Sequence, residues 1–141
     1  MSNYHETFRG VVYPWHCDHQ GHMNVMHYLG FFDQSYWHLF SMMGFTRAYM
    51  DEQHKGFVSV KDTLTYSAEQ GPGATIIIES GLTKIGSSSA VSYAVMKNSE
   101  TGETAATWEN VGVYFDLDNR VKSALNDEER TWMEKYVVES V

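Results

Sequence analysis

The stretch Trp15–Asp33, "WHCDHQGHMNVMHYLGFFD", joins a polar loop to the beginning of a long helical pattern. From Asn24 to Met43 the apolar residues recur at the three- and four-residue spacing of a helix. Asn24 is a favourable N-cap residue, and Gly44 is a favourable stop at the other end. Apolar side chains occur on most sides of this helix, which is typical of a helix wrapped by other structure.

The rest of the chain supplies segments that can wrap it. One extended segment precedes the loop and four follow the helix, namely "TFRGVVYP", "FVSVKDTLTY", "ATIIIESGLTKIG", "SSSAVSYAVMKN" and "ETAATWENVGVYFD". Near the end, Asn126 and the acidic residues after it predict a closing helix at about 126–139. We therefore predict a single α+β domain over residues 1–141, in which an antiparallel sheet of about five strands curls around the long helix.

Composition and charge narrow the possible partners. The chain has 141 residues, of which 43% are apolar, and its formal net charge is −8. This charge argues against a nucleic-acid partner, which requires a basic face. A few local cations or helix-end amides are enough to bind a small anion. Little of the chain remains to cover the outer face of the sheet, so we predict a homo-oligomer.

Cysteine usage and hydropathy indicate a compartment. Cys17 is the single cysteine, so no disulfide can form within the chain. The first ten residues lack the apolar core of a signal peptide, and no apolar run is long enough to span a membrane. These features predict a reduced, cytoplasmic protein with no membrane partner.

The histidine-rich loop first suggests a metal or thiol site. Its possible metal ligands are His16, Cys17, Asp18, His19, His22 and His27. Only His19 and His22 have the close spacing of zinc ligands, and no second cluster follows, so we favour polar loop residues over a metal site. Cys17 has His16 and His19 nearby in sequence, but a lone cysteine is more often a small buried apolar residue.

Asp18 offers a different chemistry. It precedes a glycine-containing turn that leads into the helix, where free amides can stabilise a polarised carbonyl oxygen. A carboxylate beside such amides can attack a carbonyl or take a proton from water. The alternative is that Asp18 only caps the turn. Asn24 can cap the helix instead of contacting a ligand, and Asp33 is expected to point inward and form hydrogen bonds.

The residues of this region resemble the opening motif of the 4-hydroxybenzoyl-CoA thioesterase family of hotdog-fold proteins. The residues that match the motif in order are Asp18, Gly21, His22, Asn24, Tyr28 and Asp33. The resemblance continues through the strands and covers about residues 7–120. The sequence departs from the family in the polar and aromatic flanks of Asp18 and in its C-terminal helix.

The resemblance implies a hotdog fold and an acyl-CoA thioesterase that is a homodimer or homotetramer, with its sites at subunit interfaces. It assigns Asp18 as nucleophile or general base, and the backbone amides of Asn24 and Val25 as the oxyanion hole. It implies no metal and no cofactor, because CoA is part of the substrate. The residues assigned to substrate binding are His19, Gly21, His22, Tyr28, Ser88 and Ser89.

The acyl group stays open at this stage. Candidate aromatic residues for an acyl pocket are Trp15, Tyr28, Trp37, Tyr93 and Trp108, and they suit an aromatic, short aliphatic or cationic group. Lys84 or Arg47 is a candidate cation for the nucleotide of CoA. Two rival functions remain: a non-catalytic hotdog protein that binds acyl-CoA or acts as a scaffold, and a hotdog dehydratase or hydratase.

Overall fold

The computed structural model describes residues 4–138. Its strands are β1 (His5–Val11), β2 (Lys55–Tyr66), β3 (Thr75–Ile85), β4 (Ser89–Asn98), β5 (Thr104–Asp116) and β6 (Val121–Lys122). Its helices are η1 (Pro14–His16, a 3-10 turn), α1 (Val25–Met43), α2 (Arg47–Gln53) and α3 (Asp127–Glu134). None of these helices is long and apolar enough to cross a membrane.

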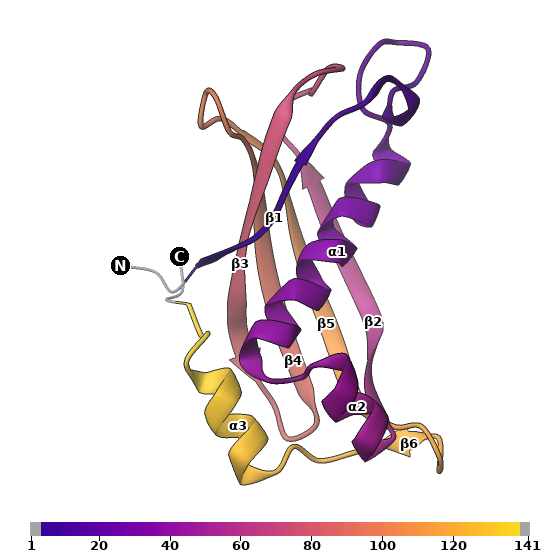
Figure 1. Cartoon of the computed structure of the whole chain (residues 1–141), viewed down its shortest axis with the longest axis vertical. Coiled ribbons are helices and arrows are strands. Elements are labelled where there is room, and N and C mark those ends of the chain that lie inside the picture. The colour runs from indigo at the N-terminus through magenta and orange to yellow at the C-terminus, as the bar shows by residue number, and fades with distance from the viewer. Residues whose placement is uncertain (1–3, 139–141) are drawn as a thin grey trace.

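The strands form one antiparallel sheet in the order β1-β3-β4-β5-β2, and the short β6 pairs with β5. The sheet curls around α1, which lies along its inner face (Figure 1). The predicted α+β architecture is therefore confirmed. β2 is an edge strand, because it pairs with β5 on one side and with no other strand of the described chain on the other.

Both predicted ends of the long helix are confirmed. The Asn24 side chain accepts a hydrogen bond from the amide of Met26 at 3.1 Å, which satisfies a free donor of the first turn. At the other end Gly44 has a φ of +129°, and a Cβ there would lie 2.8 Å from the Trp132 ring. A larger residue would be strained and would clash, so glycine is required at this position.

The core lies between α1 and the inner face of the sheet. On α1 the buried face carries large side chains, including Phe32, Tyr36 and Phe40. On the inner face of the sheet, β4 adds the small buried residues Ala90 and Ala94 to the same core. The inner residues of the strands alternate with half-exposed ones, as a sheet with one covered face requires.

The closing segment differs in detail from the prediction. α3 ends at Glu134, whereas the predicted helix extended to about residue 139, which lies outside the described residues. Its N-terminus is fixed by a capping box between Asn126 and Glu129. Glu129 is 1% exposed, and its carboxylate also accepts hydrogen bonds from the hydroxyls of Tyr49 and Tyr114. These contacts join α3 to α2 and β5.

The helix α2 was not predicted. It has seven residues, none of them fully buried, so it lacks the apolar periodicity that marked α1. It begins after Thr46, whose side chain accepts a hydrogen bond from the Tyr49 amide. It ends at Gln53, and the next residue, His54, adopts a left-handed conformation that turns the chain into β2.

Candidate active site

The loop before α1 is a tight turn tied to its surroundings. Cys17 and Met23 form an isolated bridge, and within it the Asp18 amide donates to the His22 carbonyl at 3.1 Å. Gly21 has a φ of +84°, which glycine adopts without strain. The Met23 amide donates to the Gln70 carbonyl at 2.8 Å, so the loop is attached to the segment that follows β2.

The carboxylate of Asp18 is held by two donors. Its Oδ1 accepts from the amide of Gln20 at 2.9 Å, and its Oδ2 accepts from the side-chain amide of Asn24 at 3.2 Å. The Gln20 hydrogen bond, with smaller help from Asn24, His19 and His22, holds the pKa of Asp18 below its ordinary value. Asp18 is therefore ionised at neutral pH and fixed in direction.

The two amides assigned to the oxyanion hole are not equivalent. The Asn24 amide donates to the carbonyl of His16 at 2.8 Å and is already satisfied. The Val25 amide is at the first position of α1, where no carbonyl of its own helix can reach it. It has no hydrogen-bond acceptor among residues 4–138. The geometry therefore leaves Val25 as the available donor.

Asp18 and Val25 share a cavity of about 420 Å³. Loop and helix residues form one wall, and the chain after β2 forms the other; the lining is Asp18, Gln20, His22, Met23, Asn24, Val25, Tyr28, Tyr66, Ser67, Ala68 and Glu69. The rings of Tyr28 and Tyr66 both line the cavity and pack edge to face, with their centroids 5.1 Å apart. Burial, then Tyr66 and Glu69, raise the pKa of Tyr28, so its hydroxyl stays protonated at neutral pH.

His22 contributes an unsatisfied polar atom to this cavity. Its Nδ1 is buried and forms no hydrogen bond within the described chain. Glu69 Oε2 lies 3.4 Å away, which is close enough for attraction to a protonated imidazole but does not make a hydrogen bond in this geometry. A buried polar atom without a partner favours a ligand or water that supplies one.

The structure brings some of the predicted site residues together and separates others. Asp18, His22, Asn24, Val25 and Tyr28 line the cavity, whereas His19 and Gly21 shape its turn without lining it. Ser88 ends the turn between β3 and β4, and Ser89 begins β4; this turn lies near the C-terminal end of α1, away from Asp18 (Figure 1). Sequence reasoning missed the wall formed by residues 66–69, because only the fold brings it to the loop.

The metal and thiol alternatives gain no support from the geometry. No group of three His, Cys, Asp or Glu residues within 4–138 could hold a metal ion. Cys17 Sγ lies 3.7 Å from the carbonyl of Tyr13, and His16 Nδ1 accepts from the Tyr13 amide at 2.9 Å. His16 is therefore held by the backbone and has no hydrogen bond to the Cys17 thiol, while burial and His27 lower the pKa of His16.

Asp33 was predicted to point inward, and this is wrong. The helix turns Phe32 and Tyr36 into the core and leaves Asp33 exposed. Asp33 lines a second cavity of about 330 Å³ together with Met26, Leu29, Gly30, Ser59, Asp62 and Trp108. Asp62 is held there by the Trp108 indole at 2.9 Å and by Asn110 at 2.8 Å.

The candidate aromatic residues do not line a single pocket. Tyr28 lies in the Asp18 cavity and Trp108 in the second cavity, whereas Trp15 is 70% exposed and stacks on Tyr13. Tyr93 alternates with the buried residues of β4 and therefore faces the outer side of the sheet.

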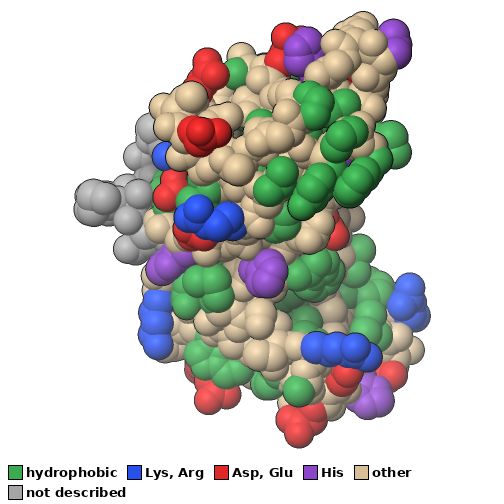
Figure 2. Space-filling view, turned by 45° about the horizontal axis from the view of Figure 1, so that its top comes forward, with side chains coloured by type: hydrophobic (Ala, Val, Ile, Leu, Met, Phe, Trp, Pro, Cys, Tyr) green, Lys and Arg blue, Asp and Glu red, His purple; other side chains and the backbone are tan. Residues whose placement is uncertain are grey.

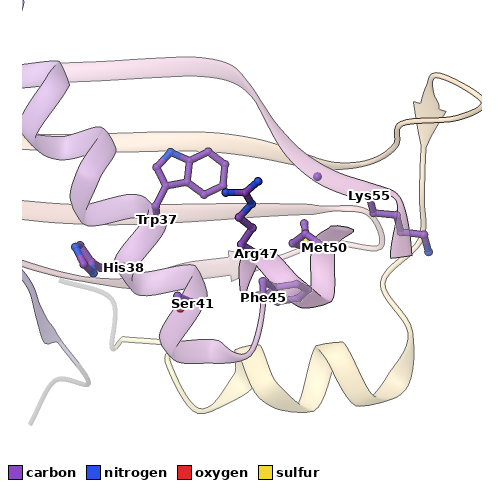
Figure 3. Close-up of a pocket in the computed structure, with 8 residues that line it drawn as sticks. Trp37, His38, Ser41, Phe45, Arg47, Met50 and Lys55 are labelled. Carbon is purple, nitrogen blue, oxygen red and sulfur yellow. The ribbon is translucent and has the colours of Figure 1, made fainter. Parts of the chain in front are cut away.

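Trp37 lines a third cavity, of about 530 Å³, between α1, α2 and the beginning of β2 (Figure 3). Its lining is Trp37, His38, Ser41, Phe45, Arg47, Met50, Lys55 and Gly56. Arg47, one of the two cations considered for the CoA nucleotide, thus lies at the opposite end of α1 from Asp18.

Comparison with known proteins identifies the family that the chain resembles. The family model described as the thioesterase-like superfamily matches residues 12–133. The probable thioesterase YbaW of Escherichia coli has a TM-score of 0.81 at 23% identity, over 94% of this chain and 99% of that one. SAV2348 of Staphylococcus aureus, solved in complex with CoA, has a TM-score of 0.85 at 16% identity, over 96% and 84%.

A third similar structure is Slr0204 of Synechocystis, a 1,4-dihydroxy-2-naphthoyl-CoA thioesterase. It has a TM-score of 0.78 at 15% identity, over 89% of this chain and 93% of that one. At these identities the structures establish a shared hotdog fold. No curated protein matches the sequence significantly.

Proposed function

The chain belongs to the thioesterase-like superfamily, and on this basis we propose that it hydrolyses the thioester bond of an acyl-CoA, with Asp18 as the catalytic carboxylate. One observation carries the proposal: an ionised, fixed carboxylate and an unused helix-end amide line the same cavity. This pair supplies what hydrolysis of a thioester needs, namely a group that starts the attack and a donor for the oxygen that becomes negative.

In this proposal the Val25 amide donates a hydrogen bond to the oxyanion that forms during the reaction. The thioester oxygen gains negative charge as the carbonyl carbon becomes tetrahedral, and the N-terminus of α1 favours that charge. The amide is fixed by the helix, so no reorganisation is needed during the reaction. Loss of one such donor typically raises the barrier by roughly 2.7–4 kcal/mol.

Asp18 has two possible routes. It can attack the carbonyl carbon, expel the CoA thiolate and form an anhydride that water then hydrolyses. Alternatively, it removes a proton from water as that water attacks. Both routes use the ionised form, which the hydrogen bonds from Gln20 and Asn24 stabilise. Repeated turnover in labelled water separates them, because only the first route places label in the Asp18 side chain.

In this proposal the other residues of the site bind the substrate or shape the cavity, and the reaction uses neither a metal nor a cofactor. His22 Nδ1 lacks a hydrogen-bond partner within the described chain and could pair with a polar group of the substrate, and Tyr28 offers a protonated hydroxyl in the same cavity. Gly21 and His19 maintain the turn that carries Asp18. Ser88 and Ser89 remain proposed contacts of the pantetheine arm, and from their position they can serve only a site of another copy.

We further propose that the protein is a homodimer or homotetramer. β2 is a long edge strand, and exposed apolar side chains continue from it onto α1: Val25, Met26, Leu29, Trp37, Met42, Val58, Val60 and Tyr66. Figure 2 shows hydrophobic side chains gathered on one face of the molecule. An exposed edge strand of this kind promotes aggregation unless it is covered. Antiparallel pairing with the β2 of a second copy would cover it.

The first experiment is a screen for thiol release across short, long, aromatic and cationic acyl-CoAs. We expect at least one acyl-CoA to be hydrolysed by the wild-type protein and none by Asp18→Ala. A folded wild-type protein inactive on the whole panel would exclude the proposal.

A non-catalytic acyl-CoA-binding protein is the alternative, supported by the likeness to SAV2348, whose structure contains CoA. It predicts a thermal shift by acyl-CoA without release of thiol.

A further inference from the structure

The second cavity, of about 330 Å³, lies between α1 and β2 and begins beside the proposed oxyanion donor. Its lining starts at Met26, the residue after Val25, and continues along α1 to Asp33. Asp33 is eight residues from Val25, which corresponds to roughly 12 Å along the helix axis. A group attached to a carbonyl at the Val25 amide can therefore extend into this cavity within a single copy of the chain.

An irregularity in β2 directs two polar side chains into the cavity. The pairing of β2 with β5 shifts between Ser59 and Lys61, as in a β-bulge. Ser59 pairs with Gly112 and Asp62 pairs with Asn110, and these two partners share one face of β5 because they are two residues apart. In a regular strand, residues three apart face opposite sides of the sheet. The bulge therefore lets Ser59 and Asp62 line the same cavity, and bulges commonly redirect side chains in this way near active sites.

The two carboxylates of the cavity have no cation beside them. Both hydrogen bonds to Asp62 end on Oδ1, one from the Trp108 indole and one from the Asn110 amide, and Oδ2 accepts none within residues 4–138. Asp33 forms neither a hydrogen bond nor an ion pair in that part of the chain, and no lysine or arginine lines the cavity. Burial, then Asp33 and Asp62, raise the pKa of Tyr36, so both negative charges act on one hydroxyl. The cavity therefore has a negative potential that no side chain of its lining balances.

A buried amide fixes the β2 side of the cavity. Asn110 is fully buried, and its Nδ2 donates to Ser59 Oγ at 2.9 Å as well as to Asp62 Oδ1 at 2.8 Å. Its own Oδ1 is buried and has no hydrogen-bond partner in the described chain. Asn110 thus holds two residues of the lining in place, and its unpaired oxygen favours a ligand or water that supplies a donor.

We infer that this cavity binds a cationic group of the substrate, so that the preferred acyl-CoAs have an acyl chain with a positively charged nitrogen several bonds from the thioester. The inference rests on the proposed function, but it uses groups of one copy only and does not depend on the proposed dimer. Met26 and Leu29 suit the methylene groups of such a chain, and Asp33 and Asp62 suit its cation. An acidic acyl group would meet like charges, and a neutral one would displace water from both carboxylates without replacing it.

The charge preference is measured with substrates that differ in charge but not in shape. Carbon in place of the quaternary nitrogen converts 6-(trimethylammonio)hexanoyl-CoA into the neutral 7,7-dimethyloctanoyl-CoA. Shorter and longer homologues of both esters vary the distance between the thioester and the charge. At the best length we expect kcat/KM to be about tenfold or more higher for the cationic ester. Equal values for the two esters at every length would overturn the inference.

Two substitutions remove the negative charges and preserve the shape of the side chains. Asp62→Asn keeps an oxygen that can accept from Trp108 and Asn110, and Asp33→Asn has no hydrogen bond to lose. We expect each to lower the ratio of kcat/KM for the cationic over the neutral ester about threefold or more, and the double variant to abolish the preference. Glu100→Gln, in the exposed turn between β4 and β5, removes an equal charge and should leave the ratio unchanged. A preference that persists in the double variant would contradict the assignment.

Binding without hydrolysis separates this inference from the proposed function. The thioethers 6-(trimethylammonio)hexyl-CoA and 7,7-dimethyloctyl-CoA match each other in shape and cannot be hydrolysed. Calorimetry should show about tenfold tighter binding of the cationic thioether to the wild-type protein, a preference that weakens as salt is added and is absent from the double variant. That result supports the cation site even if no ester is hydrolysed. Thiol release together with equal binding of the two thioethers would leave the proposed function standing and contradict the cation site.

Discussion

The side-chain amide of Asn24 lies 3.2 Å from Oδ2 of Asp18, while the Oδ1 of the same Asn24 accepts the Met26 amide at 3.1 Å. A single side chain therefore caps α1 and holds the candidate catalytic carboxylate. Its two functions can be separated by substitution, since serine can accept from the helix amide but cannot donate to Asp18 at this distance. Loss of the cap is then measured as a loss of stability, and loss of the contact to Asp18 as a change in the pH dependence of activity.

We expect Asn24→Ser to retain the free energy of unfolding within a few tenths of a kcal/mol, and Asn24→Ala to lose about 1 kcal/mol. Both variants lose the donor to Asp18, so the pKa of Asp18 should rise in each. The acid limb of kcat/KM then moves to higher pH, because the ionised form is the active one. Chemical denaturation and a pH–rate profile measure the two effects, and an unshifted acid limb would show that Asn24 does not tune Asp18.

The oxyanion donor can be removed without removing the helix. Proline lacks an amide hydrogen but is favoured at the first position of a helix, and Asn24 already has the extended backbone, with a ψ of 146°, that precedes proline. Val25→Pro should therefore fold and lose roughly 10²–10³ in kcat. Val25→Ala retains the amide and is the control. Equal activity of the two variants would show that the Val25 amide does not serve the reaction.

The proposed dimer depends on the edge of β2. Val60→Asp places a charge near the middle of the β2 edge, where antiparallel pairing with a second β2 would bring two like charges close together. We expect this variant to sediment as a monomer. Thr101→Asp, an exposed change in the turn between β4 and β5, should remain oligomeric and active. A wild-type protein that is monomeric at all concentrations would contradict the dimer.

The contacts that join α3 to the sheet are expected to contribute to the stability of the fold and not to its activity. Glu129 accepts hydrogen bonds from the Tyr49 and Tyr114 hydroxyls and from the Asn126 amide while almost fully buried. Burial, and after it the hydrogen bond to the charged Glu129, raise the pKa of Tyr49 to about 12. Glu129→Ala should lower the free energy of unfolding by roughly 1–3 kcal/mol, because buried hydroxyls lose their acceptor. Activity per folded molecule should stay unchanged. Unaltered stability in denaturation would show that this cluster does not hold α3.

The fold was predictable because its signals are local. The N-cap at Asn24, the stop at Gly44 and the change of apolar period after the helix are all read within a few residues. The structure follows them. α2 escaped prediction because a seven-residue helix without a fully buried residue has no apolar stripe.

The candidate site was predictable only in part, since it depends on long-range contacts. The sequence identified Asp18 and the beginning of α1 but offered both Asn24 and Val25 as amide donors. The hydrogen bond from the Asn24 amide to the His16 carbonyl distinguishes them, and it exists only in the folded loop. In the same way, nothing near Tyr66 in sequence indicates that it faces Tyr28.

The most direct test of the central claim is the single-turnover rate of thiol release by Asp18→Asn. This variant keeps the shape of the side chain and its capacity to accept from the Gln20 amide, but it removes the charge. With an acyl-CoA that the wild-type protein hydrolyses, we expect the rate to fall by roughly 10³–10⁴, while binding of octyl-CoA, a thioether that cannot be hydrolysed, is retained. A rate within about twofold of the wild type, too small a loss for a catalytic group, would contradict the assignment of the chemistry to Asp18.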